Sequence, residues 1–279
     1  MKLARNMMIN ISGFLLLLLI LHLRPITSQE TEDEREFDYV KGSSKGPEHW
    51  GDLHEEWAAC KKGNMQSPID LLHHEVEVVP ELGKLRRDYR TANATLKNRG
   101  HDIMLQFVDD AGSIHINGTD YDLKQCHWHS PSEHTIDGKR FDLELHMVHE
   151  SSNLSVAVIG ILYRVGRPDP FLAELEEEIQ AIADTENEVT VGMVNPKHIK
   201  MGGRKYYRYI GSLTVPPCTE DVNWTIIKRV RTVSKKQVKL LREAVHDYAE
   251  SNARPLQELN DRVIQLYEPK QHHDSSKHE

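Results

Sequence analysis

The sequence predicts one domain of the mainly β (α+β) class with a few peripheral helices. Three observations lead to this prediction. Short runs of β-type residues alternate with turns from Trp50 onward, only two stretches have helical periodicity, and no linker interrupts the middle of the chain. Of the 279 residues, 28% are charged and 38% are hydrophobic, which is typical of a folded domain and not of a disordered chain.

The expected strands share short, often alternating apolar runs bounded by turn residues. They cover residues 101–110, 113–123, 124–129, 141–150, 154–166 and 223–233. One helix is expected over 169–184, where apolar residues recur every three or four positions after a proline; they are Leu172, Leu175, Ile179 and Ile182. A second is expected over 234–250, with Ser234 as its N-cap and a stripe formed by Val238, Leu241 and Val245.

The N-terminus has the features of a secretory signal peptide over residues 1–28. Lys2 and Arg5 precede the apolar run 14–23, and small residues follow it. The run is short for a membrane span, so we expect no stable anchor after cleavage; an uncleaved signal anchor is the alternative. Residues 29–48 are expected to form a flexible acidic arm, residues 49–268 the domain, and residues 269–279 a disordered tail.

The composition bears on partners and on compartment. The formal net charge of −8 argues against a nucleic-acid partner, and the basic start of 234–250 indicates a solvated helix face. In the secretory pathway, three cysteines suggest one disulfide and one free thiol. Glycosylation triplets begin at Asn93, Asn117 and Asn153. A fourth begins at Asn223 within an apolar run, where we expect a buried, unmodified side chain.

The stretch "QCHWH" places two imidazoles on one face of an expected strand. His127 and His129 are two positions apart, and Gln125 shares their face because strand side chains alternate. Alone, this pattern fits the polar face of an ordinary strand. In 141–150, however, Glu144 and His146 also share a face, so His146 completes a three-imidazole set if the two strands are neighbours.

Three histidines favour a catalytic zinc site, because they leave a fourth tetrahedral position open. Ligand histidines need an acceptor at the second ring nitrogen, and Gln125 and Glu144 are placed for that role. His149 breaks the alternation and His134 follows a turn, so we expect both to be hydrogen-bonded structural residues.

The combination of "QCHWHSPSEHTIDG", "ELHMVHE" and "GSLTVPPCTEDVNW" resembles the α-class carbonic anhydrases, in particular their secreted plant branch. The resemblance extends from about Trp50 to Leu266 through "QSPIDL", "NRGHDI" and "NARPLQELNDR". It implies a twisted, mostly antiparallel central sheet with helices outside. The implied reaction is reversible hydration of carbon dioxide to bicarbonate and a proton by zinc-bound hydroxide. The pKa of the zinc-bound water is known to be about 7 in this family.

The resemblance also implies roles for individual residues. His127, His129 and His146 match the Zn²⁺ ligands, and Thr214 matches a hydroxyl that donates to Glu133 and accepts from the zinc-bound hydroxide. The matching apolar substrate pocket consists of Val148, Val158, Leu213, Val222 and Trp224. Val215 stands at a substrate position where many animal members have a second threonine, which removes one polar contact to bicarbonate.

His101 matches the family's proton-shuttle histidine, with an ordinary surface histidine as the rival interpretation. Arg99 and Met104 depart from the amides that relatives carry near this position. Cys60 and Cys218 match the disulfide of secreted members, which leaves Cys126 as a free core thiol.

Two other functions remain as alternatives: a storage or carbohydrate-binding protein on the same fold, and a cell-surface interaction module. The intact ligand set argues against the first. Entry into the secretory pathway leaves open both the extracellular space and onward delivery to the plastid.

Overall fold

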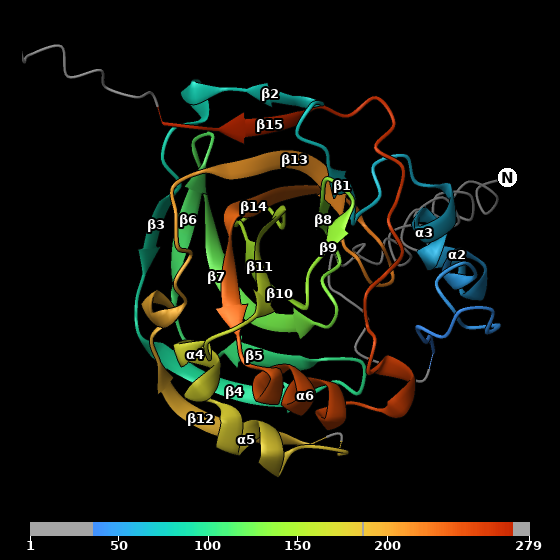
Figure 1. The fold of residues 1–279 in the computed structure, drawn as a ribbon, viewed down its shortest axis with the longest axis vertical. Coiled ribbons are helices and arrows are strands. Elements are labelled where there is room, and N and C mark those ends of the chain that lie inside the picture. The colour runs from blue at the N-terminus through green and yellow to red at the C-terminus, as the bar shows by residue number, and fades with distance from the viewer. Residues whose placement is uncertain (1–35, 186, 270–279) are drawn as a thin grey trace, which may run out of the picture.

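The fold is built on a large twisted sheet, as expected. The structure, a computed structural model, describes residues 36–185 and 187–269. In this part of the chain a 12-stranded sheet has the path β12-β4-β5-β7-β10-β11-β14-β13-β15-β2, with β6 pairing β7 and β3 (Figure 1). Within this sheet only the pairs β11–β14 and β15–β2 are parallel. The predicted mostly antiparallel sheet of a single domain is therefore confirmed.

The strands of the large sheet are β2 Val76–Val78, β3 Arg86–Tyr89, β4 Ala92–Asn98, β5 Ile103–Phe107, β6 Gly112–Ile116, β7 Thr119–His129, β10 Leu143–Glu150, β11 Val156–Val165, β12 Glu188–Val194, β13 Tyr206–Ser212, β14 Glu220–Val233 and β15 Ile264–Tyr267. A small three-stranded sheet contains β1 Asp70–Leu71, β8 Thr135–Ile136 and β9 Lys139–Arg140. The helices are α2 Trp50–Leu53, α3 Ala59–Lys62, α4 Pro170–Ala173, α5 Glu176–Ala181 and α6 Lys235–Ala244. Single 3₁₀ turns are η1 Glu55–Trp57, η2 Pro80–Leu82, η3 Pro196–His198 and η4 Asp247–Ala249.

The apolar residues gather in three clusters. One lies between the sheet and helices α4, α5 and α6, and it takes the side chains of Leu143, Leu145 and Met147 from β10. The second lies on the other face of β10 and includes Trp224. The third joins the N-terminal segment to the disulfide. Because strand side chains alternate, the face of β10 that bears Glu144 and His146 points away from the first cluster.

The prediction of a single helix over 169–184 is wrong, because the segment contains two short helices. These are α4, which Asp169 caps by accepting from two backbone N–H groups, and the separate α5, which begins after Leu175. The four apolar residues of the predicted stripe are nevertheless all buried, so periodicity identified the buried face but not the break. The second helix is also shorter than predicted, since α6 ends at Ala244; its predicted cap, Ser234, forms a capping box with Gln237.

The predicted signal peptide and nearly all of the predicted tail lie outside the described residues. Within the predicted flexible arm, residues 36–48 are described and contact the domain, because Phe37 is only 1% exposed. No helix in the described ranges is long and apolar enough to cross a bilayer. Of the glycosylation triplets, Asn93, Asn117 and Asn153 are exposed, so their use stays a prediction. Asn223 is half-buried rather than buried.

The disulfide joins Cys60 in α3 to Cys218, 158 residues later, and it confirms the predicted pair. Cys126 is a buried free thiol, also as predicted. The disulfide fastens the N-terminal helices to the loop between β13 and β14, which carries Leu213, Thr214 and Val215.

Candidate metal centre

Two neighbouring strands in the middle of the sheet bring the three predicted histidines together. β7 and β10 pair antiparallel, with His146 opposite His127 and Glu144 opposite His129. One ring nitrogen from each histidine lies within 4.8 Å of the others, and all three side chains are at most 1% exposed. The condition that the sequence left open, adjacency of the two strands, is therefore met.

Each imidazole has one ring nitrogen next to an acceptor oxygen. Nδ1 of His127 lies 2.8 Å from Oε1 of Gln125, and Nε2 of His146 lies 2.9 Å from Oε1 of Glu144, as the sequence predicts. Nδ1 of His129 lies 2.8 Å from the backbone oxygen of Asn252. Sequence reasoning missed this third partner because a backbone carbonyl leaves no residue-type signal. The three contacts orient the remaining nitrogens of the rings toward one another.

The donor set fits a zinc ion. Nδ1 of His146 and Nε2 of His127 are 3.2 Å apart, whereas two nitrogens bound at about 2.0–2.1 Å to a tetrahedral ion lie roughly 3.3 Å apart. Nε2 of His129 is buried and has no hydrogen-bond partner among the described residues. A buried polar atom of this kind is expected where a ligand or ion completes the contacts.

The charge environment of the three rings differs from one to the next. Burial holds the pKa of His127 well below its usual range, although the Asp102 carboxylate acts in the opposite sense. Burial also lowers the pKa of His129, but the nearby carboxylates of Glu133 and Asp102 outweigh it and the pKa is raised. Metal binding requires neutral imidazoles, so an ion at this place displaces a proton wherever a ring carries one.

Glu144 connects His146 to the segment that carries Glu133. Its Oε1 accepts from Nε2 of His146 and, at 2.7 Å, from Nδ1 of His134. Its Oε2 accepts from the backbone N–H groups of Glu133 and His134 at 2.9 and 2.8 Å. Burial alone would raise the pKa of Glu144, but the two histidines and these bonds hold it well below the usual range. The carboxylate is therefore ionised and fixed.

His134 and His149 are hydrogen-bonded inside the fold, as expected. Nε2 of His134 lies 2.6 Å from the Tyr209 hydroxyl, so both of its ring nitrogens have partners. His134 also forms a second potential metal group with Glu144 and His146, but those contacts already satisfy its ring. His149 follows a register shift after Val148 and bonds to the Tyr89 hydroxyl at 2.8 Å. Burial lowers its pKa to about 3.

Glu133 and Thr214 are both buried, and Glu133 lies next to His129. Oε1 of Glu133 accepts from the backbone N–H of Arg254 at 2.9 Å, a contact that the sequence did not reveal. Oε2 lies 3.7 Å from Nε2 of His129 and has no hydrogen-bond partner within the described part of the chain. The hydrogen bond implied between Thr214 and Glu133 is thus not made in this structure. The acceptor atom for this bond, Glu133 Oε2, is buried and available.

The residues predicted to form the apolar wall of the pocket all belong to one hydrophobic cluster. Val158 pairs with Val148 on one side and Trp224 on the other, and these three share a cluster with Leu213 and Val222. The ring of Trp224 lies 4.8 Å from that of His146. Opposite His146 the chain has Gly160, where a Cβ atom would lie 2.5 Å from Ile226 Cδ1 and 3.0 Å from Glu144 Oε1. Val215 instead packs in the third cluster, with the disulfide.

His101 is fully buried, which excludes its interpretation as an ordinary surface histidine. It lies in the turn between β4 and β5, and its ring is 5.1 Å from that of Phe37. The departures noted in the sequence are also buried: Arg99 forms a bidentate ion pair with Asp102 at 2.8 and 2.6 Å, and Met104 pairs in register with His127.

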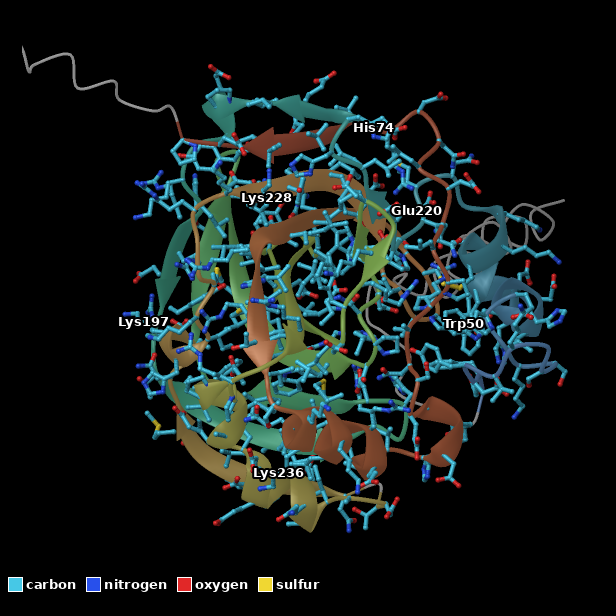
Figure 2. All side chains as sticks on the ribbon, viewed as in Figure 1. Trp50, His74, Lys197, Glu220, Lys228 and Lys236 are labelled. Carbon is cyan, nitrogen blue, oxygen red and sulfur yellow. A yellow bond between two sulfur atoms is a disulfide. The ribbon has the colours of Figure 1, made fainter. Side chains whose placement is uncertain are left out.

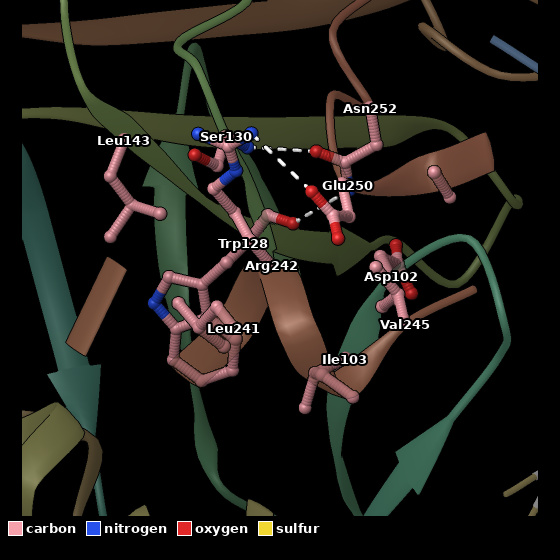
Figure 3. Close-up of a pocket in the computed structure, with 11 residues that line it drawn as sticks. Asp102, Ile103, Trp128, Ser130, Leu143, Leu241, Arg242, Val245, Glu250 and Asn252 are labelled. Carbon is pink, nitrogen blue, oxygen red and sulfur yellow. Dashed lines mark hydrogen bonds and ion pairs between the residues drawn. The ribbon is translucent and has the colours of Figure 1, made fainter. Parts of the chain in front are cut away.

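A small pocket opens behind the turn that carries His101. Its lining includes Asp102 on one side and residues of β7 and α6 on the other, and the Ser130–Asn252 hydrogen bond and the Arg242–Glu250 ion pair cross it (Figure 3). Its volume of about 10 Å³ is enough for roughly one water molecule. None of the three clustered histidines lines it, so it is not the candidate site.

A profile of the eukaryotic-type carbonic anhydrases matches residues 45–268. The chain belongs to this family. Among curated carbonic anhydrases, alpha carbonic anhydrase 7 of Arabidopsis thaliana is 61% identical over 241 residues, which are 86% of this chain and 88% of that protein.

Relatives with another name also match this chain. Dioscorin DB3L of Dioscorea polystachya is 52% identical over 251 residues, covering 89% of this chain and 92% of that protein. The crystal structure of dioscorin complexed with ascorbate superposes with a TM-score of 0.83 at 48% identity, covering 85% of this chain and 99% of that one. Membership of the family therefore fixes the fold, and the chemistry depends on the residues of the site.

Proposed function

We propose that this carbonic anhydrase family member is a zinc enzyme that interconverts carbon dioxide and bicarbonate. The observation that supports this most directly is the convergence of three buried imidazoles, each with an acceptor at its other ring nitrogen, beside an apolar wall. Such a set holds a metal with an open position, which is the arrangement of catalytic rather than structural zinc sites.

Zinc held by His127, His129 and His146 would supply a nucleophile at neutral pH by lowering the pKa of a water molecule. Glu133 Oε2 then provides the acceptor for the Thr214 hydroxyl, whose own oxygen can act only as an acceptor toward the nucleophile. This fixes the direction in which the nucleophile presents its lone pair. The wall formed by Val148, Val158, Leu213, Val222 and Trp224 holds a small uncharged substrate and excludes water.

A storage or carbohydrate-binding protein on the same fold is the second candidate, because relatives that carry a name other than carbonic anhydrase, the dioscorins, are similar to this chain over most of its length. Zinc analysis of the purified chain together with its rate of carbon dioxide hydration separates the two. We expect one zinc per chain and an activity that a chelator removes and added zinc restores. A folded chain that binds no zinc, or that hydrates carbon dioxide no faster with zinc than without, would contradict the enzyme.

His101 is proposed to carry the proton between the site and buffer. We expect His101→Ala to slow turnover in dilute buffer and to leave kcat/KM in concentrated buffer nearly unchanged, because a small buffer can then accept the proton directly. Added imidazole should restore the rate. Stopped-flow hydration across a buffer series measures this. Equal rates for the variant and the wild type in dilute buffer would remove His101 from the reaction.

Delivery to the secretory pathway is proposed from the signal-like residues 1–28, and the Cys60–Cys218 disulfide is consistent with it. The exposed Asn93, Asn117 and Asn153 then become candidates for glycosylation.

A further inference from the structure

His101 is enclosed by the protein, and the ring of Phe37 is one of the groups that pack against it. Its side chain is 0% exposed, and the ring of Phe37 lies tilted against it at a centroid distance of 5.1 Å. Phe37 is itself 1% exposed and is 64 residues earlier in the chain. A histidine that exchanges protons with buffer needs contact with water. Proton exchange at His101 therefore requires the contact with Phe37 to open.

Phe37 is held by an aromatic cluster of the N-terminal segment. Its ring packs edge-on against Trp50 at 5.3 Å and against Trp57 at 6.1 Å, and the cluster also contains the disulfide. Trp50 belongs to α2 and is labelled at the right of Figure 2. Its indole N–H lies 3.1 Å from the carbonyl oxygens of Asp38 and Lys45, which closes residues 38–45 into a loop.

Besides Trp50, hydrogen bonds near the surface hold this loop, among them the one from the Gly42 N–H to Glu48 Oε1 at 2.9 Å. The Asp38 carboxylate accepts from the Val40 N–H at 2.8 Å and from the Ser43 hydroxyl at 2.6 Å. Val40 is 47% exposed, and neighbouring residues of the loop are exposed as well. Segments whose hydrogen bonds are exposed open locally at a lower free energy than segments whose hydrogen bonds are buried.

The turn that carries His101 is fixed much more firmly. The buried Arg99–Asp102 ion pair spans it. The His101 carbonyl accepts from the Asn252 side chain at 2.8 Å, and the Gly100 carbonyl accepts from the His246 N–H at 3.0 Å. Of the two elements that meet at the Phe37–His101 contact, the N-terminal one is therefore the one that can move.

We propose that residues 36–45 are a cover over His101, seated by Phe37, and that opening of this cover limits proton exchange between His101 and buffer. This rests on the proposed function, in which His101 carries the proton. If the cover is open for about a tenth of the time, removing it accelerates the buffer-limited step by up to about tenfold.

The test compares Phe37→Ala with Asp38→Ala. The first removes the ring from the contact. The second removes only the two hydrogen bonds that the Asp38 carboxylate accepts within the loop, and so guards against a fold defect in the first. Val40→Ala, an exposed change in the same segment, is the matched control. Carbethoxylation of His101 by diethyl pyrocarbonate, followed by peptide mass spectrometry, measures its access to solvent, with the exposed His74 as internal reference.

We expect both variants to label at His101 several-fold faster than wild type, and Val40→Ala to label at the wild-type rate. Turnover in dilute buffer should rise in both, with unchanged kcat/KM in concentrated buffer, and the rise should vanish when His101→Ala is added. Wild-type labelling in both variants would overturn the cover. Faster labelling without faster turnover would overturn its control of proton exchange. Lack of hydration at any buffer concentration would contradict the enzyme, while the labelling would still report on the cover.

Discussion

His146→Ala is expected to abolish tight zinc binding while the fold largely persists. The change removes one of three ligands, so the loss of affinity should exceed the roughly 10–100-fold that follows removal of a partner behind a ligand. The sheet should survive because β10 keeps its pairing with β7 and β11, and because Glu144 keeps its bonds to His134 and the Glu133 N–H.

Zinc content after dialysis against a chelator, together with circular dichroism, measures this prediction. His198→Ala is the matched control, since that histidine is about half exposed, pairs with Glu174 and does not belong to the group of three histidines. A full equivalent of zinc in folded His146→Ala would refute the assignment of the metal centre.

Arg99→Ala is expected to lower the free energy of unfolding by about 3–5 kcal/mol, because it leaves a buried carboxylate without its partner. The side chains of Arg99 and Asp102 are only 2% and 0% exposed, and two hydrogen bonds join them. Urea unfolding at neutral pH gives the value. The double variant Arg99→Ala/Asp102→Ala should recover part of the loss, because it removes the unpaired charge. A loss below about 1 kcal/mol, the level of an exposed ion pair, would show that the pair is not buried in solution.

The same ion pair gives a dependence of stability on pH. Burial alone would raise the pKa of the Asp102 carboxyl, but Arg99, with smaller contributions from His101 and His127, holds it well below its usual range. Because the folded-state pKa lies below the unfolded value of about 3.9, the pair stabilises the fold above pH 4 and its contribution fades as the pH falls toward the folded-state pKa. The stability gap between wild type and Arg99→Ala should therefore narrow in acid.

The cluster of three histidines could be predicted because its signal is local. Strand alternation places His127 and His129 on one face and His146 beside Glu144, and only strand adjacency remained to be seen. The contacts of Asn252 and Arg254 could not be predicted in the same way. Both residues lie in a segment without regular secondary structure, and they act through a backbone oxygen and a backbone N–H that carry no residue-type signal.

The other differences between the predicted and the observed structure also arise because local sequence patterns do not show which parts of the chain meet. Periodicity found the buried stripe of 169–184 but not its division into α4 and α5, since separate short helices can bury the same residues. Strands β4, β12 and β13 were not among the expected runs. The burial of His101 depends on Phe37, and nothing in either local pattern indicates that these two residues meet.

Both strands that carry the histidines are interior, since β7 and β10 lie between β5 and β11 and far from the edge strands β12 and β2. Amide protons of such strands are expected to exchange with deuterium only through global unfolding. The fold therefore positions the three histidines without the help of a metal ion. Unlike a zinc finger, which folds around its ion, this chain should lose and regain zinc without losing its shape.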